Sequence, residues 1–228
     1  MTATLPQGEE KVRAVRTMFD TIAPRYDLVN RLMTFRMDVG WRRTTVARLD
    51  LPVGARVLDL ACGTGDLCRE LAASDLRPVG VDLSFGMLAA ARTSAPLVHA
   101  DVLRLPVPDG RADHPGQLDE EGSEVHEVPQ REPAGRPVRP GGRIALLEVA
   151  EPPNPVLRWG HGLYFGAVVP RIGALLSDGA AYRYLPKSVA YLPEPEVMLE
   201  MLAGAGFVRP RRDLLSAGIA QLLTATRG

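Results

Sequence analysis

The first 49 residues show the spacing of hydrophobic positions that is typical of helices. Apolar side chains recur at steps of three and four, at Val12, Val15, Phe19 and Ile22. Pro24 then interrupts this pattern. A charged, helical pattern then continues to Leu49. The pattern predicts a group of N-terminal helices over residues 9–49.

From Arg56 the pattern changes to short apolar runs that alternate with helical segments. The predicted strands are RVLDLA (56–61), RPVGVDLS (77–84) and a short third run that begins LVHADV (97–102). The segments between them, GTGDLCRELAAS and FGMLAAARTSA, have helical spacing. This alternation is typical of the α/β class, with a doubly wound, mostly parallel sheet and right-handed crossovers.

The second half of the chain contains further predicted strands and helices. GGRIALLEVAEP (141–152) predicts another strand, and the glycine-interrupted segment 156–177 predicts a helix. A helix over EPEVMLEMLAGAGF (194–207) and a final strand over GIAQLLTATRG (218–228) complete the expected order. No internal repeat is evident.

Composition and charge favour a globular protein with a small partner. Lys and Arg together number 27, as do Asp and Glu, so no overall positive charge favours nucleic acid as a partner. Cys62 and Cys68 are too few for a disulfide framework and wrongly spaced for a zinc site, so no metal is expected. They indicate reduced thiols in the cytoplasm. Neither a signal sequence nor a membrane-spanning run is expected.

The segment VLDLACGTGDL (57–67) is the most informative motif of the chain. Asp59 ends the first predicted strand, and Gly63, Thr64 and Gly65 follow it. Glycine has no Cβ, so the backbone can turn tightly there and approach a ligand closely. A glycine pair alone is weak evidence, and the motif gains weight only from the acidic residues that follow.

Two more acidic residues end the next two predicted strands. Asp82 lies where a carboxylate can accept both hydroxyls of a ribose, and Asp101 ends the third strand. Three acidic residues at successive strand ends would surround an adenosine, but they supply no positive charge to bind a pyrophosphate. This favours a ligand that carries its own positive charge over a dinucleotide. The alternative is that these aspartates only cap helices.

These motifs resemble those of class I methyltransferases that bind S-adenosylmethionine. The resemblance implies that the glycine loop passes beneath the methionine moiety and that the second-strand acid holds the ribose. The third-strand acid and its neighbour would address the adenine. The residues that correspond are Asp59, Gly63, Thr64, Gly65, Asp82, Asp101 and Val102. Ala61 stands where many members have glycine.

Two further segments are similar to the C-methyltransferases of menaquinone and ubiquinone biosynthesis, at residues 19–42 and 139–155. The first carries that family's Tyr-Asp-x-x-Asn motif and a tryptophan soon after it, at Tyr26, Asp27, Asn30 and Trp41. Asp38, Thr34 and Ala150 depart from the usual His, Ser and Ser. The resemblance implies an N-terminal helical cap over residues 1–49 and a methyltransferase domain over 50–228.

The same resemblance implies the reaction. We expect methylation of demethylmenaquinol to menaquinol with S-adenosylmethionine as donor. The alternatives are C-methylation of a ubiquinone precursor or another small acceptor, and a catalytically silent protein that only binds the donor. A phenolic proton must leave as the ring carbon attacks, so a general base is expected. The catalytic residue is unknown. Tyr26 and Asp27 are the candidates. His99 and His161 are the other titratable side chains considered, although His161 is more simply a core histidine.

The acceptor of such a reaction is a polyprenyl quinol, which lies in the bilayer. We therefore expect a cytoplasmic protein that meets the inner face of the cell membrane. Residues 156–177 are apolar but contain Arg158, His161 and Arg171, which suits a helix at the membrane surface or a lid. A core helix is the equal alternative. The oligomeric state and the length of the prenyl tail cannot be inferred from the sequence.

Residues 111–138 do not fit this family. QLDEEGSEVHEVPQREPAG (117–135) stands where the family has its fourth strand, with a pattern like C-G-F-x-L-R-N, and then an apolar helix. Asp109-Gly110 and the turn 139–142 flank it at the expected separation. A segment rich in proline and glutamate cannot form a central strand, because it lacks ladder donors and would bury unpaired carboxylates. We expect a disordered, exposed loop.

The complementary DNA strand of this segment restores the missing pattern. Codons for residues 134 back to 128 can encode C-G-F-A-L-R-N on the opposite strand, and those for 127 back to 113 can encode F-V-D-L-A-A-F-F-V-E-L-A-R-V-V. Glutamate codons give only Phe or Leu, and glutamine codons only Leu. We infer an in-frame inversion of this block, arising in nature or in the assembly or making of the sequence. The alternative is a disordered insert that replaced the strand.

Overall fold

The computed structural model describes residues 8–102, 105, 126–127, 138–176 and 192–228. The N-terminal helices are α1 (Gly8–Ile22), a 3₁₀ turn η1 (Ala23–Arg25), α2 (Tyr26–Met33) and α3 (Met37–Leu49). The break at η1 contains Pro24, as the sequence predicts, because proline has no amide hydrogen to continue the helix. The expected helical N-terminal group is confirmed.

The first sheet follows the predicted alternation of strands and helices. Its elements are β1 (Arg56–Leu60), α4 (Asp66–Ala72), β2 (Arg77–Asp82), α5 (Phe85–Ala89), β3 (Leu97–His99) and β4 (His126–Glu127). The strand order is β1-β2-β3-β4, and every neighbouring pair is parallel. Parallel strands bring their carboxyl ends to one edge, so the turns after β1, β2 and β3 lie together there.

The second sheet is antiparallel and contains the C-terminal part of the chain. Its strands are β5 (Arg143–Val149), β6 (Phe207–Leu215) and β7 (Ala220–Arg227), in the order β5-β7-β6. The sequence predicted β5 as a strand without giving its partner, and in the described residues it pairs with β7, antiparallel. The α/β class itself is confirmed.

The sequence analysis also missed strand β6. Pro210 and several arginines hide the strand pattern of this segment. The ladder shifts register between Val208 and Arg211, at the proline, and β6 is an edge strand. An edge position tolerates proline because one side of the strand needs no ladder donor. The helix α9 (Pro195–Gly204), which its spacing predicted, packs against β6.

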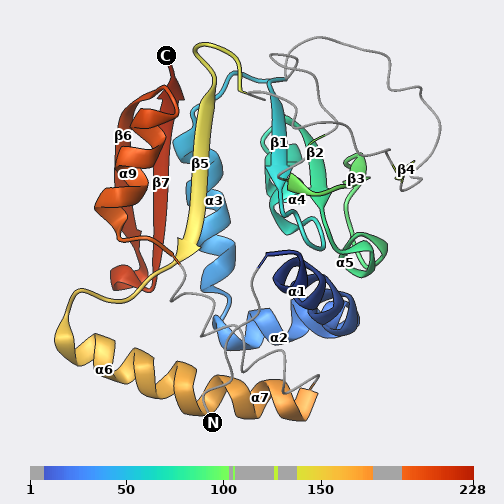
Figure 1. The fold of residues 1–228 in the computed structure, drawn as a ribbon, viewed down its shortest axis with the longest axis vertical. Coiled ribbons are helices and arrows are strands. Elements are labelled where there is room, and N and C mark those ends of the chain that lie inside the picture. Colours follow the sequence, from blue (N-terminus) through green and yellow to red (C-terminus); the bar gives the residue numbers. More distant parts are fainter. Residues whose placement is uncertain (1–7, 103–104, 106–125, 128–137, 177–191) are drawn as a thin grey trace.

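The remaining helices lie along one end of both sheets (Figure 1). They are α6 (Pro155–Leu163), a π-helical segment η3 (Tyr164–Val168) and α7 (Val169–Leu176). These three consecutive elements, the α6–η3–α7 row, correspond to the helix predicted over 156–177. The row contacts α2, where the Tyr164 hydroxyl donates to the Met33 carbonyl at 2.9 Å. A separate 3₁₀ turn, η4 (Ser216–Gly218), precedes β7.

Most of the anomalous segment 111–138 lies outside the described residues. Within it the structure describes residue 138 and β4, whose two residues extend the outer edge of the sheet beside β3. We did not expect a strand here, and those two residues correct that expectation. They pair at the edge, however, and not at the central position that the family pattern assigns to this segment.

Candidate functional site

The loop after β1 turns through residues with left-handed backbone conformations. The φ angles are 58° at Ala61, 56° at Gly63 and 76° at Gly65, which ends the loop at the start of α4. Glycine adopts this conformation without the steric cost that a side chain imposes, whereas Ala61 bears that cost. A Cβ on Gly63 would meet no atom within 4 Å, so the backbone there faces open space.

Asp82, at the end of β2, joins this loop as the sequence predicted. Its Oδ2 accepts from the Gly63 amide at 2.8 Å, and its Oδ1 accepts from the Ser84 amide at 2.8 Å. A carboxylate has about four acceptor positions, so each oxygen can accept one further hydrogen bond. The side chain can therefore hold the loop in place and still accept two ligand hydroxyls.

Asp59, in β1, comes shortly before the loop. Its carboxylate is buried, and Oδ2 accepts from the Cys68 thiol at 3.2 Å. Burial raises the pKa of Asp59 to about 6, because the charged form loses its hydration, and the nearby Asp82 carboxylate raises it further. Asp59 therefore links β1 to α4, the two elements that flank the loop.

Asp27 and Tyr26, the two catalytic candidates, reach the loop from α2. The Thr64 hydroxyl donates to Asp27 Oδ1 at 2.5 Å, which ties the N-terminal helices directly to the glycine loop. Tyr26 lines the cleft described below and packs edge-on against Phe19, with ring centroids 6.2 Å apart. The structure thus brings Tyr26 to the open side and engages Asp27 in a structural hydrogen bond.

The predicted adenine-binding residues follow β3. Asp101 and Val102 are partly buried two and three residues after His99, the last residue of the strand. His99 pairs in register with Asp82, and its Nε2 lies 2.9 Å from the Leu83 carbonyl. Asp101 therefore follows the strand that pairs with the end of β2, two residues beyond the partner of Asp82. His99 is engaged with the backbone.

His161 lies on α6, apart from the glycine loop. Its ring stacks on Phe165 with centroids 4.3 Å apart, and burial lowers its pKa. Its Nε2 is buried without a hydrogen-bond partner in the described part of the chain. It is therefore not the satisfied core histidine that sequence analysis favoured.

A cleft of about 920 Å³ begins at the glycine loop and runs between β1 and β5. At the loop end it is lined by Tyr26, Asn30 and Arg42 together with Cys62, Gly63 and Thr64. Asp82, Asp101 and Val102 do not line it. Of the predicted donor-binding residues, Asp59, Gly63 and Thr64 line the cleft.

An ionic cluster behind the loop was missed by sequence analysis. Arg42 Nη2 lies 2.8 Å from Asp38 Oδ2 and 3.0 Å from Asp66 Oδ2. Asp38 is buried and also accepts from the Thr34 hydroxyl at 2.7 Å. A signal existed in the four-residue spacing of Asp38 and Arg42 on a helix, but the link to Asp66 needs the tertiary fold.

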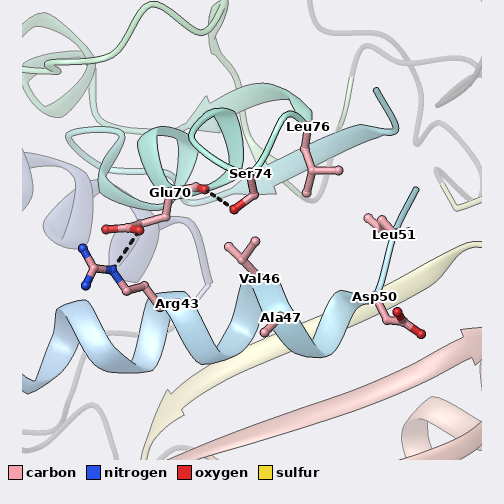
Figure 2. A pocket seen from close by; sticks show the side chains of 8 residues that line it. All are labelled: Arg43, Val46, Ala47, Asp50, Leu51, Glu70, Ser74 and Leu76. Atoms are coloured by element: carbon pink, nitrogen blue, oxygen red, sulfur yellow. Dashed lines mark hydrogen bonds and ion pairs between the residues drawn. The ribbon is translucent and has the colours of Figure 1, made fainter. Parts of the chain in front are cut away.

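A second, smaller pocket of about 270 Å³ lies between α3 and α4 and contains none of the predicted site residues (Figure 2). Arg43 Nε bonds Glu70 Oε2 at 3.3 Å across its mouth, and Val46 and Leu76 point into it. This is a packing gap between two helices. Among the described side chains, no group of three His, Cys, Asp or Glu residues could hold a metal ion.

No helix in the described ranges is long and apolar enough to cross a bilayer. This finding bears on the described helices alone.

Comparison with known proteins supports the motif-based resemblance. The sequence model of the ubiE/COQ5 methyltransferase family matches residues 6–113 and 127–227, and skips 114–126 inside the anomalous segment. A ubiquinone/menaquinone biosynthesis C-methyltransferase UbiE from Syntrophotalea carbinolica is 41% identical and covers 93% of each chain. A demethylmenaquinone methyltransferase from Deinococcus radiodurans is 39% identical over 93% of this chain and 92% of its own.

Among solved structures, the magnesium protoporphyrin IX methyltransferase of Synechocystis with bound S-adenosylmethionine covers 100% of both chains at 16% identity, with a TM-score of 0.53. This similarity supports the fold class. The family match and the two relatives cover nearly all of the sequence outside residues 114–126. The chain therefore belongs to the ubiE/COQ5 methyltransferase family.

Proposed function

We propose that the protein transfers a methyl group from S-adenosylmethionine to a ring carbon of demethylmenaquinol, which gives menaquinol. The relatives named above support this reaction. The structural observation that carries it is the hydrogen bond between Asp82 and the Gly63 amide, because it aligns a ribose acceptor with an open glycine loop. S-adenosylmethionine supplies the electrophilic methyl group of a sulfonium.

We assign donor binding to the residues that the motifs identify. Asp82 keeps two acceptor positions for the ribose hydroxyls, and Gly63 to Gly65 leave room for the methionine moiety. Asp101 and Val102 would address the adenine from the end of β3. Asp59 lines the cleft beside the loop, and the Cys68 thiol holds its carboxylate in place.

The two candidate bases have different roles in this proposal. Tyr26 lines the cleft and can contact the acceptor, whereas the Asp27 carboxylate accepts the Thr64 hydroxyl and positions the loop. The N-terminal helices, from Gly8 to Leu49, bring both side chains to the site. Orienting the quinol and excluding water supply the rest of the rate enhancement.

We also propose that the α6–η3–α7 row meets the inner face of the cell membrane. Val156, Trp159 and Leu175 are 75%, 73% and 83% exposed, which is unusual for large apolar side chains on a single helical row. Phe35, 71% exposed, continues this surface beside Tyr164, with ring centroids 5.7 Å apart. Such a surface gives a soluble enzyme access to a lipid quinol.

A ubiquinone precursor is the second candidate acceptor, because the name of the relative from Syntrophotalea carbinolica refers to the biosynthesis of both ubiquinone and menaquinone. The test is complementation of a bacterium that lacks its own demethylmenaquinone methyltransferase, followed by quinone profiling. The chain as it stands is compared with a form that has the complementary reading of residues 113–138. Accumulated menaquinone supports the proposal. If neither form restores menaquinone while a ubiquinone precursor is methylated, the second candidate holds.

Donor binding is tested separately by calorimetry with S-adenosylmethionine. Asp82→Ala removes the acceptor for two hydroxyls and should weaken binding by about 1.5–3 kcal/mol. Because Asp82 also anchors Gly63, the unfolding midpoint without ligand is measured in parallel. Asp75→Asn, at an exposed aspartate, is the control. Unchanged affinity in the Asp82 variant would contradict the assignment of the glycine loop.

A further inference from the structure

The donor carries a carboxylate at the end of its methionine moiety, and this group is ionised at neutral pH. The residues assigned above to donor binding are acidic, apolar or hydroxyl-bearing side chains and glycines, so none of them is a cation. A carboxylate that leaves water needs a charged or strongly donating partner. A cationic side chain beside the glycine loop would therefore complete the donor site.

The order of the strands indicates on which side of the loop this carboxylate lies. In the first sheet β1, β2 and β3 are neighbours in that order. The proposed function places the adenine after β3, the ribose at Asp82 of β2 and the methionine moiety at the loop after β1. The donor then runs along the sheet edge from β3 to β1, and its carboxylate falls beyond β1, where the cleft begins.

Arg42 is the arginine at this end of the cleft. It belongs to α3, which lies between the two sheets (Figure 1). Arg143, at the start of β5, bonds Asp50 Oδ2 at 3.4 Å, just after the end of α3. Asp50 is eight residues from Arg42, or about 12 Å along a helix. The other arginines of the cleft lie at the start of β1 or around the start of β5 and the end of β7: Arg56, Arg139, Arg143 and Arg227.

The Arg42 guanidinium is held in place and keeps a donor without a partner. Its Nη2 lies 2.8 Å from Asp38 Oδ2 and 3.0 Å from Asp66 Oδ2, and the side chain is only 12% exposed. Asp66 is the first residue of α4, directly after Gly65, so this ion pair fixes the guanidinium beside the loop. Within the described residues its Nε is buried without a hydrogen-bond partner. Buried donors normally have partners, so the unpaired Nε indicates a partner from outside the chain.

The charges around Arg42 favour an anion. Asp66 also lies 3.9 Å from Arg31 and pairs with Arg69. The three arginines share two carboxylates, those of Asp38 and Asp66, so this cluster has one positive charge in excess. Both carboxylates and Arg42 are mostly buried, which strengthens the attraction for an anion beside them.

We propose that Arg42 binds the α-carboxylate of S-adenosylmethionine, and that Asp38 and Asp66 position its guanidinium for this contact. The inference rests on the proposed donor and adds a residue of α3 to its binding site. A guanidinium that two carboxylates already orient loses little freedom when it binds a third, so the contact is pre-organised.

The experiment uses calorimetry with two ligands, S-adenosylmethionine and its decarboxylated analogue, which keeps the sulfonium and the amine. We expect the unaltered full-length chain to bind the analogue about tenfold to hundredfold more weakly, because a charge-assisted hydrogen bond is lost. Arg42→Gln should weaken S-adenosylmethionine by a similar factor and leave the analogue within about twofold. The two ligands should therefore bind this variant alike.

Arg43→Gln is the matched control. Arg43 is the next residue of α3, bonds Glu70 Oε2 at 3.3 Å and does not line the cleft, so its replacement should leave the affinities for both ligands unchanged. Arg42 also joins α3 to α4, and the unfolding midpoint of each variant is therefore measured without ligand. Arg42→Lys keeps a cation between the two carboxylates but lacks the Nε donor, and it replaces the glutamine variant if that one does not fold.

Two results would overturn the inference while the donor assignment stands. One is equal affinity of the unaltered chain for S-adenosylmethionine and its decarboxylated analogue. The other is equal weakening of both ligands in the Arg42 variants, which would mean that this arginine only supports the fold. If the unaltered chain binds neither ligand, the proposed donor and the role of Arg42 both fail.

Discussion

At the scale of single residues, Asp59 controls how stability depends on pH. Its pKa is raised from 3.8 to about 6 in the folded chain, mainly by burial. The folded state therefore binds this proton more tightly than the unfolded state does. The stability contributed by the protonated group is fully present below about pH 3.8, and it is lost as the pH rises through about 6.

Replacing Asp59 by Asn should remove this pH dependence. At about 1.4 kcal/mol per pKa unit, the charged form costs on the order of 3 kcal/mol at pH 7.5, so Asp59→Asn should stabilise the fold there by ~1–3 kcal/mol. The amide oxygen can still accept from Cys68. Urea unfolding at pH 4 and 7.5 measures the change, with Asp75→Asn as control. Lower stability of Asp59→Asn at pH 7.5 would show that the carboxylate is needed.

The glycine loop allows a matched comparison of two residues with similar backbone angles. Gly63→Ala and Gly65→Ala both place a Cβ at positive φ, which costs about 1–2 kcal/mol. Only Gly65→Ala also meets a neighbour, the Thr93 methyl carbon at 2.7 Å. We expect the larger loss of stability in Gly65→Ala, and the larger loss of donor affinity in Gly63→Ala, whose Cβ enters open space. Equal effects in both assays would refute a ligand-facing role of Gly63.

At the scale of elements, the cap and the loop are joined by side-chain contacts. Asp20 Oδ1 of α1 accepts from the Ser84 hydroxyl at 2.6 Å and the Gly86 amide at 2.8 Å, and Asp27 of α2 accepts from Thr64. These carboxylates fasten the N-terminal helices to the turns after β1 and β2. The N-terminal helices are therefore attached directly to the turns that form the candidate site.

A double-mutant cycle measures how strongly α2 and the loop are coupled. Asp27→Ala and Thr64→Val should show a coupling free energy of unfolding of about 1.5–3 kcal/mol, because the hydrogen bond involves a charged acceptor. The control cycle pairs Asp27→Ala with Thr44→Val, whose hydroxyl bonds the Gly40 carbonyl within α3. Additive effects in the Asp27 and Thr64 cycle would mean that the helices are held by packing alone.

At the scale of the whole molecule, the exposed apolar row should govern association with lipid. We expect flotation with phosphatidylglycerol and phosphatidylethanolamine vesicles at low salt, and a weaker partition, on the order of tenfold, for Trp159→Ser. Val53→Ser, at a residue 79% exposed and far from this row in the sequence, is the control. Absence of the native chain from the lipid fraction would remove the membrane proposal.

Much of the first sheet and of the loop was predictable, because its signals are local. The 3.6-residue spacing up to Leu49, the short apolar runs of β1 to β3 and the turn at Gly63 each depend on neighbours in sequence. The position of Asp82 at a strand end follows from the alternation itself, whereas β3 ends at His99, two residues before Asp101, which the sequence placed at the strand end. Strand β6 was not predicted because Pro210 is tolerated only at the edge of a sheet. The sequence does not reveal that this strand lies at an edge.

The sequence by itself indicated the family and most of the elements, and it showed that residues 113–138 depart from the family pattern, because motifs and codons are properties of the chain alone. Only the tertiary structure decided which groups meet: that the Asp59 carboxylate accepts from the Cys68 thiol, and that Arg42 joins Asp38 to Asp66. These outcomes depend on burial and on contacts between residues far apart in sequence, which no local pattern encodes.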